Sequence, residues 1–287
     1  MFSCQDWNKF LVADQEMALS YEMVGDLKRS WMKKYIACLF SFYGHDSRIE
    51  HAFITRQRAG FVHEKVSVSV PRAVIFTDSD RETWNRLLAA VIPAIAAGTV
   101  EICVFLIKNQ EKSSPELLTS LELAGIENIF LNDRAQAGTA AGMISNSADT
   151  AIIDLCSMSP VEDIFSKRPA NIQKYIRLSF ADKPRALIWT ETSMAWNYEI
   201  MKWAHPDMQF TVGGPFAHEA PEGFAKIGAD VREALEQPYD LFLGDVDIFR
   251  TSRIARGFSR GMEPFWLWPE IDKSFFTVNR GYWKEIA

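Results

Sequence analysis

The chain has 287 residues, of which 48% are hydrophobic and 24% are charged, and its formal net charge is −6 at pH 7. This length and hydrophobic share suit one large or two medium globular domains. The acidic balance leaves no basic stripe for nucleic acid, and no apolar run reaches the roughly 20 residues that a membrane-spanning helix needs.

No targeting segment is predicted at the start of the chain, and the cysteines of the chain are not closely spaced. The start MFSCQDWNKF has no basic stretch followed by an apolar core, so no signal peptide is predicted. The four cysteines, Cys4, Cys38, Cys103 and Cys156, are widely spaced and form no CxxC pair. This pattern indicates reduced, mostly buried thiols, and we expect a cytoplasmic protein.

Residues 1–63 are predicted to form a helical N-terminal segment. Apolar residues recur at helical spacing in MALSYEMVGDLKRSWMKKYIACLFSFYG, and DSRIEHAFITRQRAG predicts a further helix with Asp46 or Ser47 as its cap. His45 and His51 are six positions apart, not the four of a helical ligand pair, which favours a solvated face. KVSVSV at 65–70 alternates strictly and predicts a half-exposed strand.

Residues 64–156 are predicted to form a first α/β unit. Its apolar runs AVIF, VEICVFLI, ENIFL and TAIIDL alternate with the helical segments RETWNRLLAAVIPAIAAG, PELLTSLELAG and AQAGTAAGMIS. This alternation is typical of βαβ crossovers and of a mainly parallel sheet.

The rest of the chain predicts a second unit of the same layout. Residues 157–183 are expected to be a partly helical linker, and residues 184–268 alternate the runs RALIW, MQFTV, DLFL and FWLW with helical segments. These segments are SMAWNYEIMKWA, the region around EGFAKIGADVREALEQ, and VDIFRTSRIARG. Residues 269–287 form an aromatic tail that is expected to pack on its own chain or on a second copy in a homodimer.

The predicted fold class is therefore α/β, with two tandem Rossmann-like units and mostly parallel sheets behind a helical N-terminal segment. Parallel sheets bind ligands outside the carboxyl ends of their strands. A small-molecule ligand is expected between the two units, at the strand ends of both. The expected lining residues are Thr77, Asp78, Asn132–Arg134, Asp154–Cys156, Glu191, Gly213 and Gly214.

Two stretches of the first unit resemble histidinol dehydrogenase, a member of the aldehyde dehydrogenase-like group. LLAAVIPAIAAGTVEICVFL matches the family's IPA-x-x-AGV-x-x-I-x-V run, and LELAGIENIFLNDRAQAGTAAG matches its AGV-[DE]-E-I-Y-x-V-GG-AQA-x-AA run. The resemblance covers residues 84–154 and continues more weakly through RALIWTETSMAWNYEIMKWAHPDMQFTV. It implies a pair of Rossmann-like domains and NAD-linked oxidation of an alcohol or aldehyde at the cleft between them.

The chain departs from the family at its glycine turns. Asp133 and Arg134 replace a glycine pair before AQA, Arg72 and Ala73 replace the glycines of VPGG, and Asp154-Leu155-Cys156 replaces GPG. Glycine allows positive φ and close backbone approach to a ligand, which other side chains obstruct. We therefore expect weak NAD binding, with Asp133, Arg134 and Gln136 on the cofactor side.

The family's metal site is also altered. Its Q-A-E-H segment corresponds to KWAH here, so only His205 matches a zinc ligand, and the glutamine's place is taken by Lys202 or is deleted. The family's acid–base Glu-His pair has no recognisable counterpart. Since zinc needs several converging ligands, no zinc and no histidinol oxidation are expected.

Four further residues are candidates for the site. Gly213 and Gly214 follow a predicted strand and could admit a phosphate to a helix N-terminus, although a turn is the alternative. Cys156 ends a strand and is a candidate nucleophile, or else a buried structural thiol. Glu191 is a candidate polar ligand contact, or else a solvated loop carboxylate.

These observations leave more than one function open. The first is a divergent NAD(P)-linked oxidoreductase-like protein with an unknown substrate and with Cys156 and Glu191 as catalytic candidates. The main alternative is a catalytically silent protein of the same fold that binds a nucleotide or metabolite, regulates, or assembles. A further alternative is a different enzyme on the same scaffold, such as an acyl or aldehyde reductase that uses Cys156.

Overall fold

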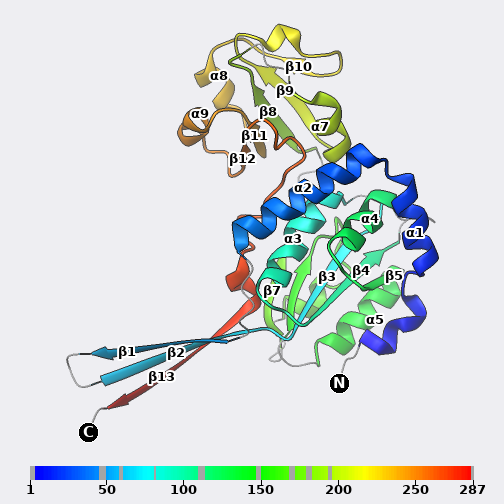
Figure 1. The fold of residues 1–287 in the computed structure, drawn as a ribbon, viewed down its shortest axis with the longest axis vertical. Coiled ribbons are helices and arrows are strands. Elements are labelled where there is room, and N and C mark those ends of the chain that lie inside the picture. Colours follow the sequence, from blue (N-terminus) through cyan, green and yellow to red (C-terminus); the bar gives the residue numbers. More distant parts are fainter. Residues whose placement is uncertain are drawn as a thin grey trace.

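The structure is a computed structural model that describes residues 4–44, 50–57, 61–80, 82–108, 114–146, 150–167, 172–178, 183–192 and 196–285. Figure 1 shows two sheets flanked by helices, one above the other, and a long arm of strands that projects from the lower one. The predicted α/β class with parallel sheets is confirmed.

The N-terminal segment is helical up to Tyr43. It comprises η1 (Cys4–Phe10), α1 (Asp14–Met23) and α2 (Asp26–Tyr43). The helix expected in DSRIEHAFITRQRAG is wrong, because Glu50–Gln57 is the strand β1 and pairs antiparallel with β2 (Phe61–Ser69). A neighbouring strand supplies backbone partners that outweigh a short and ambiguous local pattern. His45, Asp46 and Ser47 lie outside the described residues.

The first sheet contains five parallel strands in the order β5-β4-β3-β6-β7. The strands are β3 (Arg72–Asp78), β4 (Glu101–Ile107), β5 (Asn128–Asn132), β6 (Thr150–Asp154) and β7 (Ile172–Arg177). The helices are α3 (Trp84–Ala96), α4 (Pro115–Leu123), α5 (Arg134–Ile144) and α6 (Glu162–Phe165). The segment expected to be a linker thus contributes a strand, β7, to this sheet.

The second sheet has the equivalent order, β10-β9-β8-β11-β12, and is also parallel. Its strands are β8 (Arg185–Trp189), β9 (Gln209–Gly213), β10 (Ala225–Lys226), β11 (Leu241–Leu243) and β12 (Gly257–Phe258). Its helices are α7 (Tyr198–Ala204), η2 (Ala217–Glu219), α8 (Val231–Leu235) and α9 (Val246–Thr251).

Two expectations for the second unit need correction. The stretch EGFAKIGADVREALEQ is not one helix but contains β10 and α8. FWLW is not a strand, because these residues run along the junction between the units. The Tyr35 hydroxyl on α2 donates to the Trp266 carbonyl, and the Trp268 indole donates to the Arg86 carbonyl at 3.0 Å. The aromatic side chains thus fill a junction rather than join a sheet.

The C-terminal tail completes the projecting arm. After η3 (Lys273–Phe276), β13 (Thr277–Glu285) pairs antiparallel with β2, so the order in the arm is β1-β2-β13. The Trp283 ring stacks on His63 with centroids 4.1 Å apart, yet Trp283 is 59% exposed. The tail therefore packs on its own chain, which was one of the two expected arrangements.

The cysteines differ from expectation at one position. Cys103 on β4 is disulfide-bonded, whereas Cys38 and Cys156 are free. The expectation of reduced thiols throughout is wrong, and a disulfide is typical of oxidising compartments rather than of the cytoplasm. None of the described helices is both long and apolar enough to cross a membrane.

Candidate functional site

Three polar side chains end strands of the first sheet on one face. Asp78, Asn132 and Asp154 each lie two positions after a residue of the apolar cluster beneath α5, namely Phe76, Phe130 and Ile152. Because side chains alternate between the faces of a strand, the three share this face at the carboxyl edge. All three are buried, at 1%, 0% and 0% exposure.

The gap between the ends of β3 and β6 is bridged by the chain's own groups. Ser157 donates from its backbone N–H and its hydroxyl to Asp78 Oδ2, at 2.8 and 2.6 Å. Arg134 Nη1 donates to the Met158 carbonyl at 2.7 Å. The loop after β6 is thus held across the point where the strand order reverses, which is where such sheets bind ligands.

Unpartnered polar atoms lie beside this bridge. Among the described residues, neither amide atom of Asn132 has a hydrogen-bond partner, and the same holds for the hydroxyls of Thr77 and Ser79. An unsatisfied buried polar group costs about 1–3 kcal/mol. Burial without a partner is unfavourable, so these groups are the unsatisfied polar atoms of this edge.

The three predicted cofactor residues of this edge have partners within the fold. Asp133 caps α5 and accepts from the Gln136 N–H at 2.8 Å, while the Gln136 side chain accepts from the Asp133 N–H at 2.9 Å. This reciprocal capping box stabilises the helix start. Arg134 holds the loop after β6, as described above. Each of these residues, predicted to lie on the cofactor side, thus has a structural role that was not predicted from the sequence.

Cys156 is a poor nucleophile in this structure. Its side chain is fully buried in the apolar cluster beneath α5. Burial, followed by the nearby carboxylates of Asp154 and Asp78, raises the pKa of the thiol well above its ordinary value. A raised pKa leaves little thiolate at neutral pH.

The second predicted catalytic residue, Glu191, belongs to a crevice of about 490 Å³ at the carboxyl edge of the second sheet. The crevice lies beyond the ends of the adjacent strands β8 and β11, where the strand order again reverses. It is lined by Trp189, Thr190, Glu191, Thr192, Trp196, Gly244, Asp245, Val246, Ser259 and Arg260. All these residues belong to the second unit, so this crevice does not bring Glu191 to Cys156.

Gly213 and Gly214 follow β9 and pack tightly on the end of β8. A Cβ on Gly213 would lie 2.8 Å from the Trp189 ring, and one on Gly214 would lie 2.6 Å from the Thr190 carbonyl oxygen. Gly214 also has a φ of +101°, which side-chain-bearing residues rarely adopt. The two glycines are therefore explained by a tight turn, which was the alternative to a phosphate site. Neither glycine lines the crevice.

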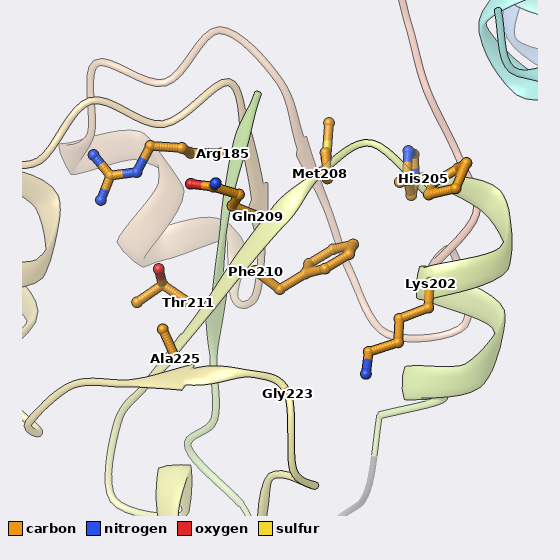
Figure 2. A pocket seen from close by; sticks show the side chains of 10 residues that line it. Arg185, Lys202, His205, Met208, Gln209, Phe210, Thr211, Gly223 and Ala225 are labelled. Atoms are coloured by element: carbon orange, nitrogen blue, oxygen red, sulfur yellow. The ribbon is translucent and has the colours of Figure 1, made fainter. Parts of the chain in front are cut away.

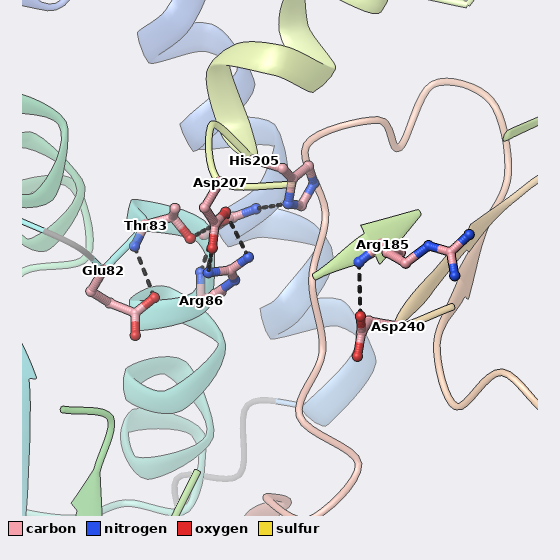
Figure 3. Close-up of polar contacts among 8 residues, drawn as sticks. Glu82, Thr83, Arg86, Arg185, His205, Asp207 and Asp240 are labelled. Carbon is pink, nitrogen blue, oxygen red and sulfur yellow. Dashed lines mark hydrogen bonds and ion pairs between the residues drawn. The ribbon is translucent and has the colours of Figure 1, made fainter. Parts of the chain in front are cut away.

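A cluster of polar side chains joins the two units (Figure 3). Asn85 Nδ2 lies 3.3 Å from His205 Nδ1, and His205 Nε2 lies 3.2 Å from the Glu263 carbonyl oxygen. Burial, and then the Arg86 cation, lowers the pKa of His205 to about 3. His205 is therefore a neutral residue of the junction.

Zinc does not fit at His205. Both ring nitrogens contact protein groups, and the neighbouring Lys202 is a cation rather than a ligand. Within the described ranges, no group of three or more His, Cys, Asp and Glu side chains could hold a metal ion.

The sequence did not lead us to predict the junction residues of α3. Asn85 and Arg86 are buried, at 0% and 2% exposure, in a helix that is otherwise apolar. Two adjacent polar residues at the start of such a helix were the available signal, because a helix that is buried all round needs partners for every polar side chain.

Comparisons with known proteins identify the fold. No protein-family model and no curated protein sequence matches the chain. The histidinol dehydrogenase of Elizabethkingia anophelis is similar in structure, with a TM-score of 0.61, 11% identity, and coverage of 98% of this chain and 79% of that one. An aldehyde dehydrogenase variant from Bacillus cereus has a TM-score of 0.53, 10% identity, and coverage of 100% and 86%.

A third similar structure contains a cofactor. PnpE from Pseudomonas sp. WBC-3, in complex with nicotinamide adenine dinucleotide, has a TM-score of 0.52, 10% identity, and coverage of 99% and 88%. At such identities the likeness shows an aldehyde dehydrogenase-like fold and nothing beyond it.

Proposed function

We propose that the chain is a divergent NAD(P)-linked oxidoreductase-like protein built from two tandem Rossmann-like units. The equivalent strand order of the two parallel sheets supports the paired units. The dehydrogenase fold of the similar structures supports the oxidoreductase class. The substrate is a small molecule that binds at the carboxyl edge of the second sheet, with Glu191 as a polar contact.

The observation that carries the proposal is the unpartnered amide of Asn132. It lies at the carboxyl edge of the first sheet, together with the unpartnered Thr77 hydroxyl. An amide and a hydroxyl can donate to and accept from the ribose hydroxyls or base of a nucleotide. Bound NAD(P) would supply the hydride chemistry, and these side chains would orient it.

The acidic residues at this edge predict weak binding of NAD(P). The Asp133 carboxylate occupies the N-terminus of α5, and Asp78 and Asp154 lie on the same face. Carboxylates repel a pyrophosphate, most strongly where water is excluded. A loss of about 3 kcal/mol weakens a micromolar site roughly a hundredfold.

The proposal excludes zinc-dependent histidinol oxidation. It rests on the misfit at His205 and on the cation at Lys202. Metal analysis of purified protein after dialysis with added zinc tests this part, and one zinc per chain retained against a weak chelator would contradict it.

Titration calorimetry with NAD and NADP tests the proposal as a whole. We expect a dissociation constant on the order of 0.1–1 mM. A value in the low micromolar range would contradict the argument from Asp133. The absence of any heat up to millimolar cofactor would instead favour the catalytically silent alternative.

We also propose that the arm of β1, β2 and β13 binds a second copy of the chain. β1 and β13 are its edge strands, which present unpaired backbone groups. Phe61, Tyr282 and Trp283 are 43%, 63% and 59% exposed on it. Light scattering should show a dimer that Tyr282→Ser with Trp283→Ser dissociates, and a monomeric parent protein would refute the idea.

A further inference from the structure

A second ligand site is indicated away from both carboxyl edges. A cavity of about 610 Å³ lies beside the amino-terminal half of β9, as Figure 2 shows. It is lined by Arg185, Lys202, His205, Pro206, Met208, Gln209, Phe210, Thr211, Gly223 and Ala225. It is larger than the crevice beside Glu191 and shares no residue with it.

The cavity follows from the shortness of β10. This strand has two residues, which pair with Thr211 and Val212 of β9. On this side, Gln209 and Phe210 have no paired strand residue among the described part of the chain. The sheet edge is therefore hollow where β9 begins, and the side chains of α7 and β8 reach it.

Two cations line the cavity, and neither forms an ion pair within the described residues. The Arg185 guanidinium lies 4.9 Å from the centre of the Tyr239 ring, and the Lys202 ammonium lies 4.6 Å from that of Phe224. Figure 2 shows the two side chains extending on opposite sides of β9. Aromatic faces orient a cation and leave its N–H groups available to an anion.

The rest of the lining is neutral. It contains no Asp or Glu, and His205 is the buried neutral imidazole of the junction. Gly223, with a φ of +89°, leaves room for the ammonium, because a Cβ there would lie 3.0 Å from Lys202 Nζ. Asp230 and Glu233 line an adjacent cavity that shares Arg185, and the Asp230 carboxylate accepts from the N–H groups that begin α8.

We propose that this cavity binds a small organic dianion that lies around the open edge of β9, with one acidic group at Arg185 and the other at Lys202. Gln209 and Thr211 add neutral hydrogen-bonding groups, and Met208 and Phe210 contact the carbon chain. Dicarboxylates and phosphorylated carboxylic acids share this chemistry. Arg185 can contact a carboxylate or phosphate with two parallel N–H groups, whereas Lys202 acts as a point charge.

Calorimetric titration of the full chain tests the proposal. The probes are the dicarboxylates malonate, succinate, glutarate and adipate, with 3-phosphoglycerate as the phosphorylated acid and butyrate as the single-charge control, all at matched ionic strength. Two separated cations predict one preferred dicarboxylate length and at least roughly tenfold weaker binding of butyrate. Tighter binding of 3-phosphoglycerate than of any dicarboxylate would assign the phosphorylated class. Equal affinity for butyrate and the dianions, or no binding of any dianion, would overturn the proposal.

Substitutions locate the site. Arg185→Gln and Lys202→Gln should each weaken the preferred dianion roughly tenfold and reduce its advantage over butyrate. Arg250→Gln, an exposed arginine of α9 that pairs with Asp247, is the matched control and should leave the affinity unchanged. An unchanged affinity in both cavity variants would refute the site. Since neither variant touches the first sheet, NAD titration of the same proteins separates this proposal from the proposed function.

Discussion

Arg86 and Asp207 join the two units through a pair of hydrogen bonds. Arg86 Nη1 and Nη2 donate to the two carboxylate oxygens of Asp207, at 2.7 and 2.9 Å, as Figure 3 shows. Arg86 lies in the first turn of α3 of the first unit, and Asp207 lies two positions before β9 of the second. The amino end of β9, rather than its carboxyl end, therefore meets the first unit at this contact.

This pair should contribute strongly to stability, because the Arg86 side chain is only 2% exposed. Asp207→Asn is expected to lower the free energy of unfolding by about 3–5 kcal/mol, since it leaves the buried Arg86 cation without its charged partner. Arg86→Gln should cost less, about 1–3 kcal/mol, because the Asp207 carboxylate that it leaves behind is 34% exposed and can be hydrated. Urea unfolding measures both.

The exposed pair Arg250–Asp247 is the control for this prediction. Both side chains are largely exposed, at 71% and 80%, so Arg250→Gln should change stability by less than about 1 kcal/mol. If Arg86→Gln and Arg250→Gln had equal effects, the Arg86–Asp207 pair would not hold the units together.

Asn132 predicts an unusual combination of effects. Replacing an unpartnered buried amide by a side chain of similar size removes a desolvated polar group, so Asn132→Leu should leave unfolding stability unchanged or raise it by up to about 1–3 kcal/mol. The same change should abolish the thermal stabilisation by NAD or NADP. Thermal unfolding with and without millimolar cofactor measures both effects.

Asn128 provides the matched control, because it begins the same strand at the opposite edge of the sheet. Asn128→Leu should retain the cofactor response. A large loss of stability in Asn132→Leu would show that the amide has a structural role. An unchanged response to cofactor would show that the nucleotide does not bind at this edge.

Much of the first sheet was predictable, because buried parallel strands appear as continuous apolar runs. β3 to β6 lie within or next to the expected runs, and α3 to α5 lie between them. β1 was not predictable, because its eight residues gain their strand partner only through β2. The strand predicted for FWLW is wrong because its apolar side chains are buried at the junction with α2 and α3 and not in a sheet.

Of the site, only the positions of residues at strand ends were predictable. The ends of the predicted strands put Thr77, Asn132 and Glu191 at the carboxyl edges of the sheets, where the structure has them. The hydrogen bonds from Ser157 to Asp78 join residues 79 positions apart, and no local pattern indicates that they bridge the gap between β3 and β6. The capping of α5 by Asp133 and Gln136 was readable from the D-x-x-Q spacing.

Glu82 predicts a pH dependence of stability. Burial raises the pKa of this carboxyl from 4.5 to about 7, although Arg86 and the Thr83 N–H act in the opposite direction. The folded protein therefore binds more protons than the unfolded chain between about pH 4.5 and 7. The stabilising contribution of Glu82 is complete below pH 4.5 and is lost as the pH rises through 7.

Glu82→Gln removes this titration and should make the protein more stable than the parent above pH 7, by roughly 1–2 kcal/mol after allowance for partial exposure. Chemical unfolding at pH 5 and at pH 8 measures the difference. The variant and the parent should converge at pH 5, and a constant difference at both pH values would assign the effect to packing rather than to the proton.

Cys156 provides the test between a nucleophile and a structural thiol. Its raised pKa and complete burial predict very slow alkylation by iodoacetamide in the native protein at pH 7.5, because the thiolate is the reacting species. Cys38 is the internal control, since among the described residues it is also a free cysteine and is partly exposed. Mass spectrometry of digested protein should show Cys38 modified first and Cys156 modified only after unfolding. Faster labelling of Cys156, slowed by added NAD, would show that the loop after β6 opens in solution and would restore the nucleophile hypothesis.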